Sequence, residues 1–170
     1  LMLAMEYGVT VGGWSAALYD AITSTRPVFT TVDVRVVDRA YAFGAPGKFA
    51  GMQFKIATQG VGTWTITWEY WNGRVWSALA GVSDGTSGFT AATGNRTLNY
   101  TEPTDWVPTK INALPTVGNL YWIRARISAF TSQPALPVLT SYEVGGSADI
   151  GSFVTVFAAV EPDDSADAAT

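Results

Sequence analysis

The clearest alternation of apolar and polar residues in the chain lies at residues 63–70. The apolar positions are Trp64, Ile66, Trp68 and Tyr70. Because successive side chains of a β-strand point to opposite faces, this pattern predicts a strand with one aromatic face. Asn72-Gly73 follows, a dipeptide that favours a tight type I′ turn, and we expect residues 74–76 to begin the return strand.

Most of the remaining chain carries similar short-period signals. Alternation or short apolar runs predict further strands at residues 32–36, 50–56, 89–90, 96–101, 119–129, 139–144 and 150–160. The last of these is apolar on both faces, as expected of a strand covered on both sides. About eight or nine short strands joined by Gly/Pro/Asp turns predict an all-β fold, a two-sheet antiparallel β-sandwich that is either a jelly roll or immunoglobulin-like.

The two ends of the chain depart from this pattern. Residues 1–27 could hold a short helix at residues 15–23 or form an extended arm, and we favour the arm. The end of the chain is acidic. We therefore predict an N-terminal arm over residues 1–27, a sandwich domain over residues 28–160 and an acidic C-terminal extension over residues 161–170.

The aromatic residues divide between two predicted roles. Because the apolar face of such a sheet must be covered, we expect a structural aromatic core. Its predicted members are Trp64, Trp68, Tyr70, Trp106 and Tyr121. Three tryptophans, Trp71, Trp76 and Trp122, lie off the apolar faces, and they could contact another subunit or stack on sugar rings.

The composition narrows the chemistry. The chain contains no cysteine and no histidine, so disulfides and thiol catalysis are excluded and the commonest general base is missing. Charged residues make up 14% of the chain, against about 25% in an average soluble domain. Neutral surfaces suit burial between subunits, because interface cores are depleted in charge. A Ser/Thr/Gly-rich secreted binding module is the alternative.

The net charge of −4 comes from the C-terminal end. Of the 14 acidic residues, four lie there (Glu161, Asp163, Asp164 and Asp167), which leaves 10 acidic against 10 basic residues over residues 1–160. Without a basic stripe we expect no nucleic-acid partner, and the same balance argues against binding to an anionic membrane. The longest apolar run, at residues 153–160, is too short to span a bilayer.

Two places could hold polar chemistry. Glu69 could meet Arg124 or Arg126 if their strands are neighbours. As a catalytic carboxylate of a glycosidase, Glu69 would need a second carboxylate, for which Glu143 is a weak candidate. We therefore favour a cross-strand ion pair. The loop at residues 84–88 offers oxygens to calcium, but with a single carboxylate it favours a plain turn in which Asp84 bonds the local backbone. We predict no catalytic residue, no metal and no cofactor.

Four motifs occur in order between residues 62 and 128. They are the hairpin sequence of residues 68–76, Asp84-Gly85-Thr86 with Phe89, the turn Pro103-Thr104-Asp105-Trp106 and the strand of residues 121–126. Together they resemble a β-sandwich domain of structural proteins of tailed bacteriophages and related prokaryotic viruses.

The resemblance implies a virion structural protein that acts by packing and is not an enzyme. The first expectation is a capsid decoration (cement) subunit on the outer surface of the particle, in contact with copies of itself and with a major capsid protein. A tail or baseplate component, in contact with a tail protein, is the alternative within that class. A carbohydrate-binding β-sandwich module, holding surface glycans on exposed aromatic rings, is the alternative from another class.

Overall fold

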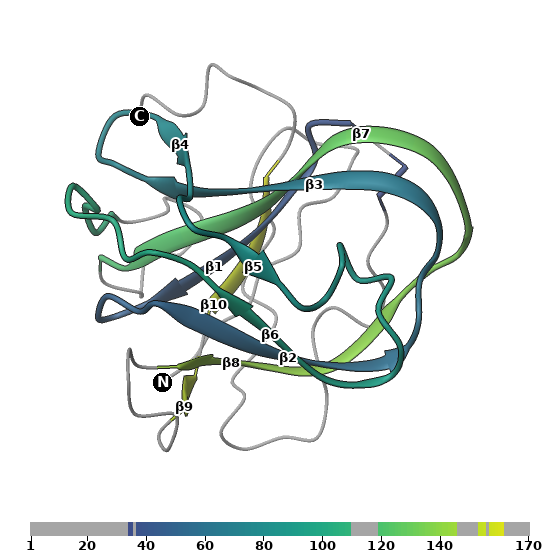
Figure 1. Cartoon of the computed structure of the whole chain (residues 1–170). Helices are drawn as coiled ribbons and strands as arrows, with labels where there is room; N and C mark the ends of the chain where they lie inside the picture. Colours follow the sequence, from purple (N-terminus) through teal and green to yellow (C-terminus); the bar gives the residue numbers. More distant parts are fainter. Residues whose placement is uncertain (1–33, 36, 110–118, 146–152, 156, 162–170) are drawn as a thin grey trace.

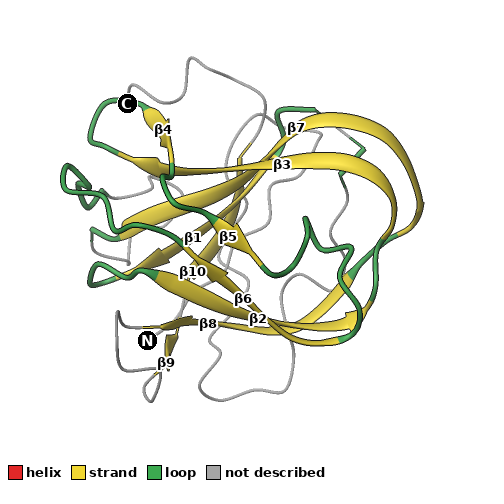
Figure 2. Cartoon of the chain, viewed as in Figure 1, coloured by secondary structure: helices red, strands yellow, loops and turns green. Residues whose placement is uncertain are grey.

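Two five-stranded antiparallel sheets form the framework of the molecule (Figure 1). The computed structural model describes residues 34–35, 37–109, 119–145, 153–155 and 157–161. These residues form ten strands and no helix, and so no helix that is long and apolar enough to cross a membrane (Figure 2). The predicted all-β, two-sheet antiparallel sandwich is confirmed.

Each sheet combines strands from both halves of the chain. The first sheet contains, in spatial order, β10 (Phe157–Glu161), β1 (Ala40–Ala45), β7 (Tyr121–Ala135), β3 (Val61–Trp71) and β4 (Trp76–Ala78). The second contains β5 (Ser83–Asp84), β6 (Gly94–Asn99), β2 (Gly51–Thr58), β8 (Val138–Gly145) and β9 (Phe153–Thr155). The pairs β1·β10, β2·β8 and β3·β7 are nested in the sequence, as in one long hairpin rolled up on itself.

Two connections carry the chain between the sheets at the same end of the sandwich. Residues 59–60 join β2 to β3, and residues 136–137 join β7 to β8. Because β2 pairs with β8 while β3 pairs with β7, a two-stranded ribbon bends from one sheet into the other; it is the broad curve of β3 and β7 in Figure 1.

The bend has its origin in β7. Three register shifts separate the paired residues of β3 and β7, and each leaves the extra residue on β7, where Ser128 is one example. Such bulges bend and twist the strand that carries them, so β7 curves while β3 keeps a regular alternation of its side chains. The Ser128 hydroxyl donates a hydrogen bond of 3.3 Å to the carbonyl of Thr65 across the bulge.

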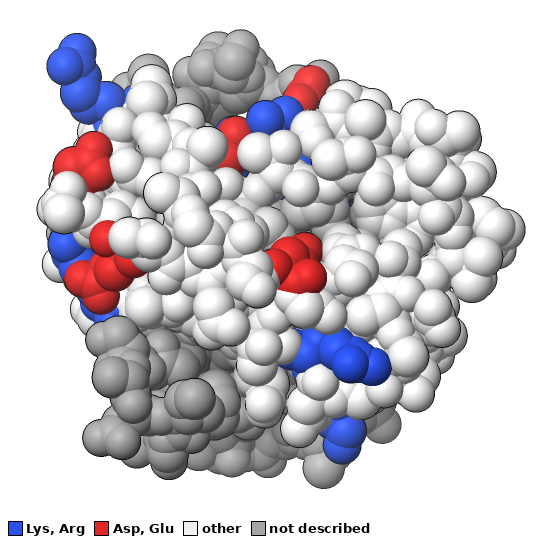
Figure 3. All heavy atoms as spheres, viewed as in Figure 1, with Lys and Arg blue, Asp and Glu red and all other residues white. Residues whose placement is uncertain are grey.

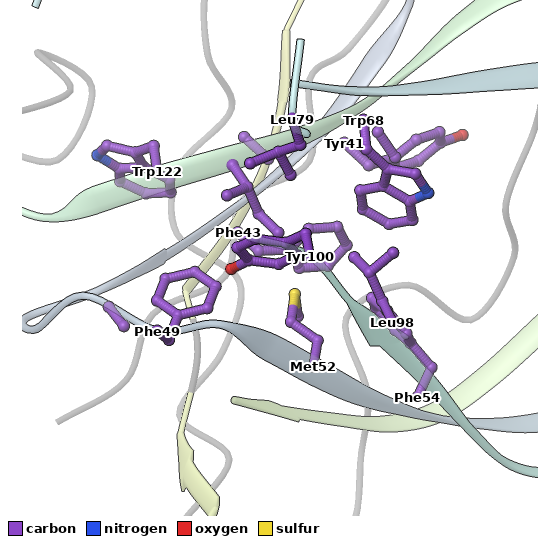
Figure 4. Close-up of a cluster of buried hydrophobic side chains, with 14 of the residues drawn as sticks. Tyr41, Phe43, Phe49, Met52, Phe54, Trp68, Leu79, Leu98, Tyr100 and Trp122 are labelled. Atoms are coloured by element: carbon purple, nitrogen blue, oxygen red, sulfur yellow. The ribbon is translucent and has the colours of Figure 1, made fainter. Parts of the chain in front are cut away.

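The facing sides of the sheets enclose an aromatic core (Figure 4). The rings of Phe43 and Trp68 lie 5.4 and 6.0 Å from that of Phe54 in the opposite sheet, and Phe89 lies 5.4 Å from Phe54, edge to face. Buried aromatic pairs in these geometries stabilise a core beyond the area that they remove from water.

All five aromatic residues that we predicted as core lie in or against this cluster. Trp68 and Trp106 are buried, whereas Trp64, Tyr70 and Tyr121 pack against the buried residues from partly exposed positions. Trp106 follows a turn at residues 104–105, as predicted, and donates its indole N–H to the carbonyl of Trp122 at 3.0 Å.

The first strand lies later than predicted. Val34 and Arg35, in the middle of the predicted strand at residues 32–36, belong to no strand, and β1 begins at Ala40. Gly44 and Ala45 complete β1. All six residues of β1 are buried. The strand therefore alternates small and aromatic residues, whereas a half-exposed strand would alternate polar and apolar residues.

The turn of the aromatic hairpin is also longer than predicted. Trp71 pairs with Trp76, which leaves a four-residue loop in place of a two-residue type I′ turn, and the return strand begins at Trp76. The Asn72 side chain stabilises this loop, because its Oδ1 accepts hydrogen bonds from the backbone N–H groups of Arg74 and Val75 at 3.0 and 2.9 Å. Only Gly73 has a positive φ there, of 94°.

Two further strand assignments were wrong. Residues 89–90, predicted as a strand, form part of a turn, and Phe89 has a φ of 68°. The single strand predicted at residues 150–160 is divided between the sheets, because β9 pairs with β8 and β10 pairs with β1. The predicted N-terminal arm lies outside the described residues, and so does the C-terminal extension beyond Glu161.

Candidate functional site

The side of the first sheet that faces away from the core brings together most of the polar and aromatic candidates. Glu69 and Trp71 share this face because they alternate with the core residues Trp68 and Tyr70 along β3. Arg124 lies opposite Glu69 on β7, and Trp76 lies opposite Trp71 on β4. We call the group formed by Asp38, Glu69, Trp71, Trp76, Arg124 and Arg126 the outer-face cluster.

Glu69 lies at the centre of this cluster. Its Oε2 accepts a hydrogen bond of 2.7 Å from Nε of Arg124, and its Oε1 accepts bonds of 3.1 and 3.0 Å from Nε and Nη2 of Arg126. The side chain of Glu69 is only 10% exposed. The structure therefore contains the ion pair that we predicted, with both arginines bound to the same carboxylate.

Asp38 extends the cluster from a turn that precedes β1. Its Oδ1 lies 2.9 Å from Nη1 of Arg126. The hydrogen bond to Glu69 is the main reason that the pKa of Arg126 is raised, with a smaller contribution from Asp38. With two carboxylates and two guanidinium groups, the cluster has a formal charge of zero. Sequence reasoning missed Asp38, because 88 positions separate it from Arg126 and nothing in the local pattern relates them.

Two tryptophans continue the cluster toward β4. The guanidinium carbon of Arg124 lies 4.5 Å from the ring centroid of Trp76, a cation–π contact. The rings of Trp76 and Trp71 meet edge to face at 5.5 Å, and both side chains are partly exposed. The two are thus adjacent on the surface, but Arg124 occupies one face of the Trp76 ring.

Trp122, the third tryptophan that we considered for an interface or for sugar stacking, is buried. It lies on the same side of β7 as Arg124 but is only 1% exposed, and its indole N–H donates to the carbonyl of Thr109 at 3.1 Å. Its ring packs over Gly44 of β1, where a side chain would collide with it. Trp122 is therefore buried on the outer side of the sheet, against Gly44 and Thr109, and presents no face to a ligand.

The loop at residues 84–88 uses its carboxylate internally. Oδ1 of Asp84 accepts hydrogen bonds from the backbone N–H and the hydroxyl of Thr86, at 2.8 and 2.6 Å. Oδ2 accepts bonds of 3.1 Å from the N–H of Gly88 and from the indole of Trp68. Donors occupy the positions that a cation would need, so this arrangement is the local turn that we favoured over a calcium loop.

The two carboxylates that we considered for acid–base chemistry, Glu69 and Glu143, come from strands of different sheets. Both oxygens of Glu69 accept from arginine, and Glu143 belongs to β8 in the other sheet. Within the described ranges, no three Asp or Glu residues are grouped so that they could hold a metal ion. The outer-face cluster is suited to joining β3, β7 and the turn before β1.

Three described segments at the bend of the sandwich contain no charged residue, and Arg35 borders them, because the N–H of the adjacent Val34 donates to the side chain of Gln133. The three segments meet there, at residues 56–68, 85–95 and 127–142, and we call them the uncharged end. They are joined by the pairing of β3 with β7 and by hydrogen bonds from the Gly60 N–H to the Phe89 carbonyl, at 3.1 Å, and from the Trp64 indole to the Gly88 carbonyl, at 2.8 Å. In Figure 3 the surface over the bend, at the right, contains neither blue nor red atoms.

Comparison of the chain with protein-family models, with curated proteins and with solved structures finds no match.

Proposed function

We propose that the chain is a non-enzymatic structural protein of a virus particle, and specifically a capsid decoration subunit that packs against copies of itself and against the shell protein. The observation that supports this proposal is the uncharged end. A contiguous surface without charge is inexpensive to remove from water, because no ion has to be desolvated or paired.

The outer-face cluster supports the same proposal. Its charges are paired within the subunit, so this face presents little net charge to a neighbour. A subunit that must lie flat on a shell gains from such internal neutralisation, because like-charge repulsion between copies is avoided.

Quantitative mass spectrometry of density-purified particles tests this function. We expect the chain to accompany the shell protein at a constant ratio through the particle fractions, in many copies per particle. A chain that is abundant in the culture but missing from every particle fraction would refute a structural role.

Carbohydrate binding is the second candidate function, and the partly exposed pair Trp71 and Trp76 favours it. Aromatic rings at a surface can stack on sugars, and Trp71 together with the face of Trp76 away from Arg124 is the candidate platform. A glycan array with the purified protein separates the candidates: saturable binding that Trp71→Ala abolishes and Val75→Ala in the same loop preserves would favour this function, whereas no binding would favour the structural one.

A further inference from the structure

Half of β3 has an open edge. One edge of the strand pairs with β7 from Val61 to Tyr70. On the other edge β4 covers only Glu69–Trp71, and the Leu79 N–H donates to the Trp68 carbonyl at 2.9 Å. Within the described part of the chain, no strand pairs with residues 63–67 on that side. Thr63 and Thr65 are exposed there.

The direction of the free backbone groups follows from the strand geometry. The Trp68 carbonyl points toward Leu79, and backbone groups alternate between the two edges of a strand. The N–H and C=O groups of Trp64 and Ile66 therefore point to the open edge, whereas the Thr65 carbonyl points to β7, where Ser128 donates to it.

Residues 63–67 lack the sequence features that usually keep exposed strands from pairing. Natural edge strands are protected by lysine, proline, inward-pointing charges or bulges. Residues 61–68 contain no proline and no charged residue, and the bulges of this ribbon lie on β7, away from the open edge. β3 presents a regular template to another strand.

We propose that this edge binds the same edge of a second copy of the chain, antiparallel, with a two-fold axis at Thr65. Trp64 then faces the partner's Ile66 and exchanges both backbone hydrogen bonds with it, and Ile66 faces the partner's Trp64, which gives about four new bonds. The overlap extends from Thr63 to Thr67 and ends before Trp68, whose carbonyl is already bonded.

The side chains fit this register on both faces. On the outer face, Thr65 meets the partner's Thr65 and Thr63 meets the partner's Thr67, which are pairs that hydrogen-bond across strands. On the inner face, Trp64 meets the partner's Ile66, a favourable aromatic–β-branched pair. No charged residue opposes another, and this self-complementarity identifies the occupant as a second copy.

The proposed dimer contact deepens the proposed function, and its role in a particle rests on that function. Dimerisation itself is measured on the isolated protein. A monomeric chain that is still found in particles would overturn the β3 contact alone. A dimeric chain that is missing from particles would overturn the structural function and leave the contact intact.

The first experiment is a single-cysteine crosslink in a chain that has no cysteine of its own. Opposed residues that do not exchange hydrogen bonds lie about 4.5 Å apart between Cα atoms, within the range for a disulfide. Thr65→Cys should therefore form a covalent dimer under mild oxidation, whereas Thr97→Cys, at an exposed threonine of β6, should form far less. Equal yields from both variants, or no dimer from Thr65→Cys, would overturn the register.

The second experiment uses charge at the axis, where a residue meets its own copy. Thr65→Lys and Thr65→Glu should each weaken dimerisation by about tenfold or more in analytical ultracentrifugation, and an equimolar mixture should recover it as a mixed dimer. Thr97→Lys should leave association unchanged. A wild-type chain that stays monomeric at millimolar concentration, or a dimer indifferent to Thr65→Lys, would refute the contact.

Discussion

Glu69 connects three parts of the first sheet through one carboxylate. It belongs to β3, its two arginines belong to β7, and Arg126 in turn holds Asp38 in the turn before β1. Glu69 and its two arginines are mostly shielded from water. Removal of one of these side chains would therefore leave the remaining charges desolvated and without a counter-charge. The group therefore stabilises the sheet only when it is complete.

Substitution of Glu69 tests this interpretation. We expect Glu69→Gln to lower the free energy of unfolding by about 2–4 kcal/mol, because two partly buried guanidinium groups lose their counter-charge. Chemical denaturation followed by tryptophan fluorescence measures the change. Glu102→Gln, at an exposed carboxylate, is the matched control and should have almost no effect; equal stability of Glu69→Gln and the wild type would show that the ion pairs are unimportant.

Tyr100 carries a buried hydroxyl that has no hydrogen-bond partner among the described residues. Burial is the main cause that raises the pKa of Tyr100 well above its ordinary value, and the nearby Glu102 raises it further. As the pH rises past about 10, tyrosine in the unfolded chain loses its proton while folded Tyr100 keeps it. The unfolded state is then favoured, and stability falls with increasing pH.

We predict that Tyr100→Phe is neutral or stabilising at pH 7, within about 1 kcal/mol, because it removes an unsatisfied polar group. The variant should also lose less stability than the wild type in alkaline solution. Tyr70→Phe is the contrasting variant, because the Tyr70 hydroxyl donates to Asp105 at 2.7 Å, and it should be neutral or destabilising at pH 7. Urea unfolding at neutral and alkaline pH measures the free energy of unfolding of each variant. A clear loss of stability in Tyr100→Phe at pH 7 would contradict the prediction, because it would reveal a hydrogen-bond partner for the hydroxyl.

At the scale of the element, β1 depends on small residues to lie under Trp122. Gly44 is paired with Trp122 on β7, and a β-carbon at Gly44 would lie 2.6 Å from the indole ring. The ring is fixed by its hydrogen bond to Thr109 and is fully buried, so it has little room to move. One glycine thus sets how closely the indole of β7 covers β1.

We expect Gly44→Ala to destabilise the protein by about 1–3 kcal/mol through overpacking. Gly47→Ala is the control, because a β-carbon at Gly47 would meet nothing within 4 Å. Thermal unfolding of the two variants measures the difference, and equal midpoints would mean that the indole shifts without cost.

The elements that the sequence predicted best are those with one buried face. β3 shows a strict alternation because its aromatic side packs on the core while its other side carries threonine and Glu69. β1 was missed because both of its faces are covered, and the hairpin loop was misjudged because the Asn72 side chain caps a four-residue loop that the Asn-Gly pair does not distinguish from a tight turn. The division of residues 153–161 between two sheets depends on distant strands and has no local signal.

The outer-face cluster could be predicted only in part, because some of its contacts join segments that are distant in the sequence. Alternation placed Glu69 and the two arginines off the apolar faces of their strands, and the pairing of β3 with β7 joined them. The position of Asp38 and the burial of Trp122 depend on segments that come together only in the folded chain.

At the scale of the whole molecule, charge is distributed unevenly. On the face shown in Figure 3, the acidic and basic residues lie away from the bend, which Arg35 borders beside Gln133. The uncharged end combines exposed Val61, Thr63 and Thr65 with the uncharged half of β7. The open edge of β3 lies in the same region. Both features are expected of a subunit whose surface is covered by neighbours in an assembly.

An image of the protein in its native particle, by electron cryo-microscopy, tests this account most directly. The account predicts repeated copies of a two-sheet sandwich on the particle, with neighbouring subunits packed against the uncharged end and a second copy along the open edge of β3. Particles in which both surfaces face solvent, or in which no copy of this sandwich is found, would contradict it.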